Sequence, residues 1–128
     1  METRRSWDIP PPSLSKESEY SSHNDPLYKD LKNVPDAESL KNTFERVVPY
    51  FEKNIEKYLK VEKNIILSAH GNTIRALGKK IFNISDKSIN LLEIPTGNPL
   101  IIHFDNSGKV LSTKYLDESR KTEIISNQ

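Results

Sequence analysis

The sequence predicts an α/β domain, and three observations support this fold class. Hydrophobic residues recur at steps of three and four through residues 38–60, which is typical of an amphipathic helix. Residues 64–69 form a short apolar segment, as expected for a strand covered on both faces. Residues 73–82 return to helical periodicity directly afterwards. A buried strand that leads straight into a helix belongs in an α/β sheet.

Composition limits the classes of function that the chain can have. Its 128 residues fit one domain, and 19 basic against 18 acidic residues give a net charge of only +1. A charge so close to zero argues against general binding to nucleic acid or to acidic membranes. The sequence has no cysteine, which excludes disulfides and thiolate metal sites. Because no apolar run is long enough for a signal or membrane segment, we expect a cytoplasmic protein.

The chain divides into three parts. Residues 1–36 are rich in proline, serine and asparagine, and we interpret them as a loop segment on the substrate side. Their scattered apolar residues predict a segment that lies over a surface, with disorder of part of it as the alternative. Residues 37–116 carry the α/β pattern, and residues 117–128 are a polar tail that we expect to be mobile.

The local signals predict the boundaries of most elements. Asp36 is a candidate cap for the long helix, and Pro49 is expected to kink it because proline lacks the amide hydrogen. Ser85 begins a short helix that reaches Leu91. Further on, the sequence predicts a turn over residues 94–99, a strand over 100–104, a turn over 106–108 and an antiparallel strand over 109–116.

His70 is the first candidate site residue. It stands where the predicted strand ends and the next helix begins, followed by Gly71 and Asn72. Backbone amides at such a junction, aided by the helix dipole, form a pocket suited to phosphate. A protonated His70 could stabilise a transferring phosphoryl group, whereas a neutral one could act as nucleophile or base. The alternative is a histidine that only hydrogen-bonds a neighbouring loop.

Arg4 and Arg5 form the second candidate. Two adjacent guanidinium groups can hold a phosphate or carboxylate through paired hydrogen bonds, and the nearby Trp7 and three prolines would stiffen the segment. The alternative is a solvated surface pair. No spacing of histidine and acidic residues indicates a metal site, so no metal is expected.

Four segments together resemble a known family. They are, in order, METRRSWDIPPPSL, AESLKNTFERVVPYF, IILSAHGNTIRALGKKI and IPTGNPLIIHFD. They resemble the carboxyl-terminal half of 2,3-bisphosphoglycerate-dependent phosphoglycerate mutase, in the histidine phosphatase superfamily, from Arg4 to about Leu116. The resemblance implies a partial histidine phosphatase fold that lacks the amino-terminal strands. It also implies interconversion of 3- and 2-phosphoglycerate in glycolysis and gluconeogenesis, through a phosphohistidine primed by 2,3-bisphosphoglycerate without a metal.

The resemblance also assigns roles to the candidate residues. Arg4 and Arg5 match the pair that clamps the substrate, and Gly71 and Asn72 match a pair that binds the ligand. His70 matches a second histidine, which stabilises the transition state and does not carry the phosphoryl group. The family's Arg-His-Gly motif and its acid-base glutamate are not found in this sequence. We therefore expect the chain to be inactive alone.

The apolar strand edges left by the absent strands predict a partner, either a separate amino-terminal half or another copy of the chain. Three hypotheses follow for function. The chain is one part of a mutase, or a noncatalytic module that binds phosphorylated acids, or a decayed remnant. The sequence leaves open whether the parent enzyme is chiefly a mutase, a phosphatase or a synthase.

Overall fold

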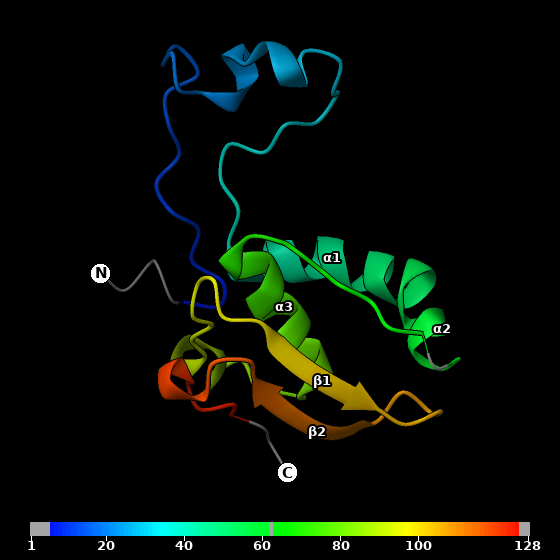
Figure 1. The fold of residues 1–128 in the computed structure, drawn as a ribbon. Helices are drawn as coiled ribbons and strands as arrows, with labels where there is room; N and C mark the ends of the chain where they lie inside the picture. Colours follow the sequence, from blue (N-terminus) through cyan, green and yellow to red (C-terminus); the bar gives the residue numbers. More distant parts are fainter. Residues whose placement is uncertain (1–5, 62, 126–128) are drawn as a thin grey trace.

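In the computed structural model, which describes residues 6–61 and 63–125, two packed helices lie beside a two-stranded hairpin (Figure 1). The longer elements are α1 (Leu40–Asn54), α2 (Glu56–Leu59), α3 (Gly71–Ile81), β1 (Leu100–Phe104) and β2 (Val110–Tyr115). Four 3-10 turns complete the described structure: η1 (Ser22–Asn24), η2 (Pro26–Tyr28), η3 (Ile89–Leu91) and η4 (Glu118–Arg120). The predicted mixture of helix and strand is confirmed.

Helix α1 begins at a capping box centred on Ser39. The Ser39 hydroxyl accepts from the Asn42 amide at 3.1 Å, and the Asn42 side chain accepts from the Ser39 amide at 3.1 Å. The prediction that Asp36 caps this helix is wrong, because Asp36 precedes the cap by three residues and instead bonds His23 Nε2 at 2.6 Å. The helix continues through Pro49, and Ile55 separates it from α2.

The predicted buried strand over residues 64–69 is wrong for this structure. Residues 63–70 have no assigned secondary structure and are exposed throughout. Ile66, at the centre of the segment, is 98% exposed. A strand needs a neighbour to satisfy its backbone and cover its faces, and among the described residues β1 and β2 pair only with each other. The segment therefore runs as an extended coil in front of α1 and α2 (Figure 1).

The predicted antiparallel hairpin is confirmed. Leu100 pairs with Tyr115 and His103 with Ser112, after which the register shifts so that Phe104 pairs with Val110. The shift leaves Leu111 as an extra residue on β2, where it is 67% exposed. The connecting turn closes at Gly108, whose φ of 86° is readily adopted only by glycine.

The core lies between the helices and the hairpin. It is formed by the buried side chains of Leu40, Ala76, Phe82, Ile84, Ile89 and Leu92. Leu100, Ile102 and Val110 of the hairpin pack against this cluster, as do Trp7 and Phe44. Two of the most deeply buried residues, Ile89 and Leu92, belong to η3 and its end rather than to a long element. The short helix predicted over residues 85–91 is thus a turn followed by η3.

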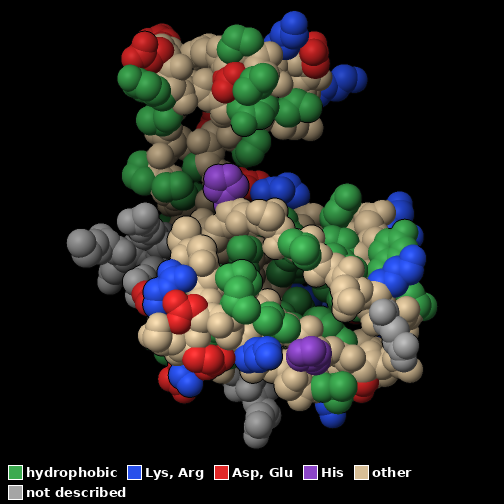
Figure 2. Space-filling view, in the orientation of Figure 1, with side chains coloured by type: hydrophobic (Ala, Val, Ile, Leu, Met, Phe, Trp, Pro, Cys, Tyr) green, Lys and Arg blue, Asp and Glu red, His purple; other side chains and the backbone are tan. Residues whose placement is uncertain are grey.

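The prediction that the proline-rich segment lies over the surface of the body is wrong for most of the segment. Figure 1 shows this segment extending away from the helices and the hairpin, and Figure 2, in the same orientation, shows it as a lobe joined to the body by a narrow neck. Hydrophobic side chains remain exposed on it, with Tyr20 at 80% and Leu27 at 83%. At the other end of the chain, Asn98 donates to the Asp117 carbonyl at 2.9 Å, and Thr122 donates to the Glu93 carbonyl at 2.5 Å. These bonds hold the described part of the tail against the turn before β1.

Candidate functional site

His70 is the N-cap residue of α3, directly before the first helical residue, Gly71. Its backbone is extended, with φ −66° and ψ 153°, and its carbonyl accepts from the Ile74 amide at 3.1 Å. Its imidazole makes no capping hydrogen bond and is exposed to solvent. The backbone of His70 therefore starts the helix while its side chain is accessible to a ligand.

The first turn of α3 is open to solvent. Gly71 and Asn72 are exposed, and a Cβ built on Gly71 would meet nothing within 4 Å. The first intrahelical hydrogen bond runs from the Ile74 amide to the His70 carbonyl, so the amides of residues 71–73 have no intrahelical acceptor. Together with the helix dipole, they make this end of α3 attractive to an anion. The structure thus brings His70, Gly71 and Asn72 together as one short continuous feature.

The buried side chain of Arg75 connects the first turn of α3 to the residues of η3. Its Nε donates to the Leu92 carbonyl at 3.1 Å, and one terminal nitrogen donates to the Ile89 carbonyl at 2.8 Å. The other terminal nitrogen lies 3.4 Å from the side-chain oxygen of Asn72. The residue is only 9% exposed. Arg75 is not among the site residues predicted from the sequence, although an arginine on the apolar face of a helix indicates that its side chain is buried.

Arg4 and Arg5 lie outside the described residues. Trp7, which the structure does describe, packs its ring edge-on against Phe44 with centroids 5.4 Å apart.

Three side chains outside α3 have pKa values shifted from their ordinary values. The side chains of Arg120 and Ser119 lower the pKa of Asp117 to about 2. Hydrogen bonds from Ser107 and Lys109 lower the pKa of Asp105, and bonding to Glu38 raises the pKa of Arg46. These shifts come from turns and from one ion pair.

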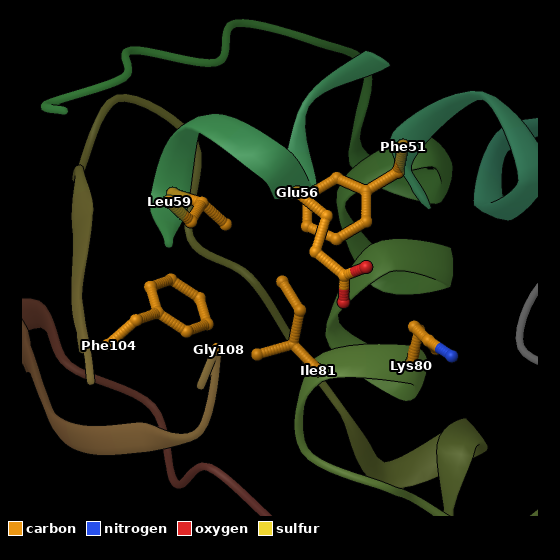
Figure 3. A pocket seen from close by; sticks show the side chains of 7 residues that line it. All are labelled: Phe51, Glu56, Leu59, Lys80, Ile81, Phe104 and Gly108. Carbon is orange, nitrogen blue, oxygen red and sulfur yellow. The ribbon is translucent and has the colours of Figure 1, made fainter. Parts of the chain in front are cut away.

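A hollow of about 120 Å³ lies near the other end of α3 (Figure 3). Its lining residues are Phe51, Glu56, Leu59, Lys80, Ile81, Phe104 and Gly108. The Lys80 ammonium pairs with Glu52 at 2.6 Å. An eleven-residue helix is roughly 16 Å long, so this hollow is distinct from the His70 feature. Within residues 6–61 and 63–125, no cluster of three or more histidine and acidic side chains could hold a metal.

Comparison with known proteins identifies the domain. Residues 13–116 match the model of the histidine phosphatase superfamily, branch 1. The chain belongs to the histidine phosphatase superfamily. The family assignment made from the four sequence segments is confirmed. Of the predicted site residues, His70, Gly71 and Asn72 lie inside the match, whereas Arg4 and Arg5 precede it.

Relatives of this histidine phosphatase chain are named 2,3-bisphosphoglycerate-dependent phosphoglycerate mutase. The protein from Pelagibacter ubique is 45% identical over 124 residues, which cover 95% of this chain and 52% of the relative. That from Pasteurella multocida is 49% identical over 115 residues, covering 88% and 51%. That from Caulobacter sp. strain K31 is 47% identical over 117 residues, covering 91% and 49%. The chain spans about half the length of the curated relatives it matches.

No helix in the described parts of the chain combines the length and the hydrophobicity needed to cross a lipid bilayer.

Proposed function

We propose that the chain forms the ligand-binding half of a phosphoglycerate mutase-type domain. In this proposal the completed domain interconverts 3- and 2-phosphoglycerate in glycolysis and gluconeogenesis, and hence in the cytoplasm. The observation that carries it is the open first turn of α3, which directly follows its N-cap His70, in a chain whose relatives are named as mutases. Exposed amides and an adjacent imidazole are groups that bind phosphate.

Each candidate residue has one role in this proposal. The amides of Gly71 and Asn72 bind the ligand, and His70 stabilises the phosphoryl group as it is transferred. Arg4 and Arg5 clamp the phosphate or carboxylate of phosphoglycerate. The nucleophilic histidine and the acid-base glutamate come from an amino-terminal half, and 2,3-bisphosphoglycerate primes the cycle. No step requires a metal.

The extended segment over residues 63–70 supports the proposal that an amino-terminal half completes the domain. Residues 63–70 are extended but have no strand beside them, and Ile65, Ile66 and Leu67 expose hydrophobic side chains. Both outer edges of the β1–β2 sheet also lack a strand neighbour among the described residues. A chain supplying strands would satisfy these backbones and cover these side chains. We propose a separate amino-terminal half as this partner, and a second copy of the chain as the alternative.

A mutase assay tests the proposal. The purified chain is assayed with 3-phosphoglycerate and a priming amount of 2,3-bisphosphoglycerate, alone and after co-refolding with the amino-terminal half of the Pelagibacter relative. We expect activity only in the mixture, and a loss of about 100-fold or more with His70→Ala. His103→Ala, at an exposed position of β1, is the matched control and should keep full activity. An active chain alone that loses activity with His70→Ala would instead make His70 the nucleophile.

A noncatalytic module that binds phosphorylated acids is the second candidate. It is favoured by the fact that the open first turn of α3 lies entirely within this chain. Calorimetry with 3-phosphoglycerate would detect binding by the chain alone, and failure to gain activity in the mixture would favour this candidate. A decayed remnant would show neither binding nor a cooperative unfolding transition.

A further inference from the structure

The lobe formed by residues 8–36 has a defined shape but no hydrophobic core of its own. The Asn24 side chain donates to two backbone carbonyls of the lobe at 2.7 and 2.9 Å, and His23 Nε2 lies 2.6 Å from a carboxylate oxygen of Asp36. All of residues 8–36 are described, and Ser21 is the only buried residue among them. Polar bonds therefore shape the lobe, while its apolar side chains stay in contact with solvent.

Large hydrophobic side chains are exposed over the lobe. Leu14, Tyr20, Leu27 and Leu31 are each more than half exposed, and Tyr20 and Leu27 are the most exposed of them. Figure 2 shows hydrophobic side chains gathered on the face of the lobe that is drawn. Because leaving such side chains together in water is unfavourable, a cluster of this kind is typical of a surface that another chain covers.

We propose that the lobe is a docking surface for the amino-terminal half of the domain. The family match covers residues 13–116, so nearly all of the lobe belongs to the domain and is not a linker. The Pelagibacter relative aligns with 95% of this chain but with only 52% of its own length. The other half of such a domain is the chain that covers the lobe. This inference rests on the proposed function, because it takes the same amino-terminal half as the partner.

The lobe and the extended segment over residues 63–70 face the same side of the molecule. In Figure 1 this segment runs in front of α1 and α2, and Ile66 at its centre is almost fully exposed. Figure 2, in the same orientation, shows hydrophobic side chains on the body as well as on the lobe. A partner that adds a strand beside residues 63–70 is therefore in position to cover the lobe too. Two contacts on one partner strengthen each other, because the second forms at a high effective concentration.

The charge of the lobe defines the partner's surface further. Residues 8–36 contain six acidic side chains and three lysines, so the lobe is negatively charged although the whole chain is nearly neutral. A complementary surface carries apolar side chains at its centre and arginine or lysine around them. Association should therefore weaken when salt screens these charges.

The test compares single substitutions of exposed hydrophobic side chains by serine. Tyr20→Ser and Leu27→Ser change the lobe, and Ile66→Ser changes the extended segment. Leu111→Ser is the matched control, because Leu111 is 67% exposed but lies on β2, outside both surfaces. All four side chains are exposed, so circular dichroism should show an unchanged fold in each variant.

Sedimentation measures the dissociation constant of each variant for the amino-terminal half of the Pelagibacter relative, after co-refolding and dilution. We expect each lobe variant, like Ile66→Ser, to raise this constant about tenfold, an effect typical of an important interface side chain. Leu111→Ser should stay within about twofold of the parent. Raising the salt concentration from about 0.05 to 0.5 M should weaken the parent complex severalfold. A dissociation constant that did not change with salt would refute a basic partner surface.

The possible failures are distinguishable. If the parent chain does not associate with the amino-terminal half, the proposed function fails and the docking surface is overturned with it. If Ile66→Ser weakens the complex while both lobe variants bind like the parent, only the docking surface is overturned. A parent chain that dimerises alone, and loses the dimer in the lobe variants, would show that a second copy covers the lobe, which also overturns the proposal.

Hydrogen exchange on the parent chain replaces any lobe variant that misfolds. Docking should slow the exchange of the lobe amides by about tenfold or more when the amino-terminal half is added. Lobe amides that exchange equally fast with and without this half would overturn the proposal.

Discussion

Replacing Arg75 by methionine should destabilise the domain strongly. The guanidinium joins α3 to the η3 region by donating to the Ile89 carbonyl at 2.8 Å and the Leu92 carbonyl at 3.1 Å. Ile89 is 0% and Leu92 1% exposed, so water has little access to these carbonyls once the donors are removed. Methionine fills much of the space of the arginine stem but donates nothing.

The magnitude follows from these two bonds. A hydrogen bond from a charged donor contributes about 1.5–3 kcal/mol, and a buried carbonyl left without a partner carries a comparable penalty. The variant should therefore lose roughly 3–6 kcal/mol of unfolding free energy, a large part of the roughly 5–15 kcal/mol typical of a domain. The contact to Asn72 at 3.4 Å is long and is left out of this sum.

Urea unfolding followed by circular dichroism measures the loss. With a slope near 2 kcal/mol per molar urea, the midpoint should fall by roughly 1.5–3 M. Arg46→Met is the matched control, because Arg46 also makes two side-chain bonds, both at 2.9 Å to Glu38, but its side chain is 59% exposed. The control should lose no more than about 1 kcal/mol. Equal losses in the two variants would refute the argument from burial.

Three further predictions concern other parts of the chain. Ser39→Ala removes the capping box and should cost about 1 kcal/mol of unfolding free energy in urea titrations, whereas Asp36→Ala should leave the helical signal unchanged. Asp117→Asn should lower the melting temperature near pH 7. Because the folded pKa of Asp117, about 2, lies below its ordinary 3.8, its stabilising effect is complete above 3.8 and is lost as pH falls toward 2. Calorimetric melting temperatures of parent and variant should therefore converge over that range, and a constant difference would contradict the assignment. Ile66→Ser should change the stability of the chain alone by less than about 0.5 kcal/mol, since the side chain is 98% exposed, yet weaken association with an amino-terminal half in sedimentation experiments.

The elements that sequence predicted correctly are those that local forces decide. Helices α1 and α3 follow from apolar periodicity, and the hairpin follows from a tight turn between two neighbouring strands that pair with each other. The cap of α1 was misassigned because Asp36 and Ser39 are both good caps by type. Only the reciprocal bond with Asn42 decides between them, and it requires a spacing of three residues from the cap.

In the candidate site, too, the residues set by local sequence could be predicted and those set by distant contacts could not. His70, Gly71 and Asn72 are contiguous, so their juxtaposition at the start of α3 could be predicted from the chain alone. Arg75 could not be assigned a role, because its partners come from elsewhere in the chain. Its side chain reaches a carbonyl 17 residues away. No local pattern specifies such contacts.

The absence of strand pairing at residues 64–69 within the described chain bears on function, because His70 directly follows this segment. The composition of residues 64–69 is that of a covered strand, but a strand depends on a neighbour that these residues do not find within the described chain. His70 directly follows this segment, so α3 fixes its backbone on one side only. Strand pairing by a partner would fix the other side, and binding of the partner and of phosphoglycerate should therefore be coupled.

Hydrogen exchange measures that coupling. In the chain alone, the amides of residues 64–69 should exchange nearly as fast as those of an unfolded peptide, because they are exposed and have no strand partner. Adding an amino-terminal half should slow their exchange by about 100-fold or more, which corresponds to a local opening free energy of roughly 3 kcal/mol. The same addition should strengthen binding of 3-phosphoglycerate. Mutase activity that appeared in the mixture without protection of residues 64–69 would show that the site is completed by some route other than strand pairing.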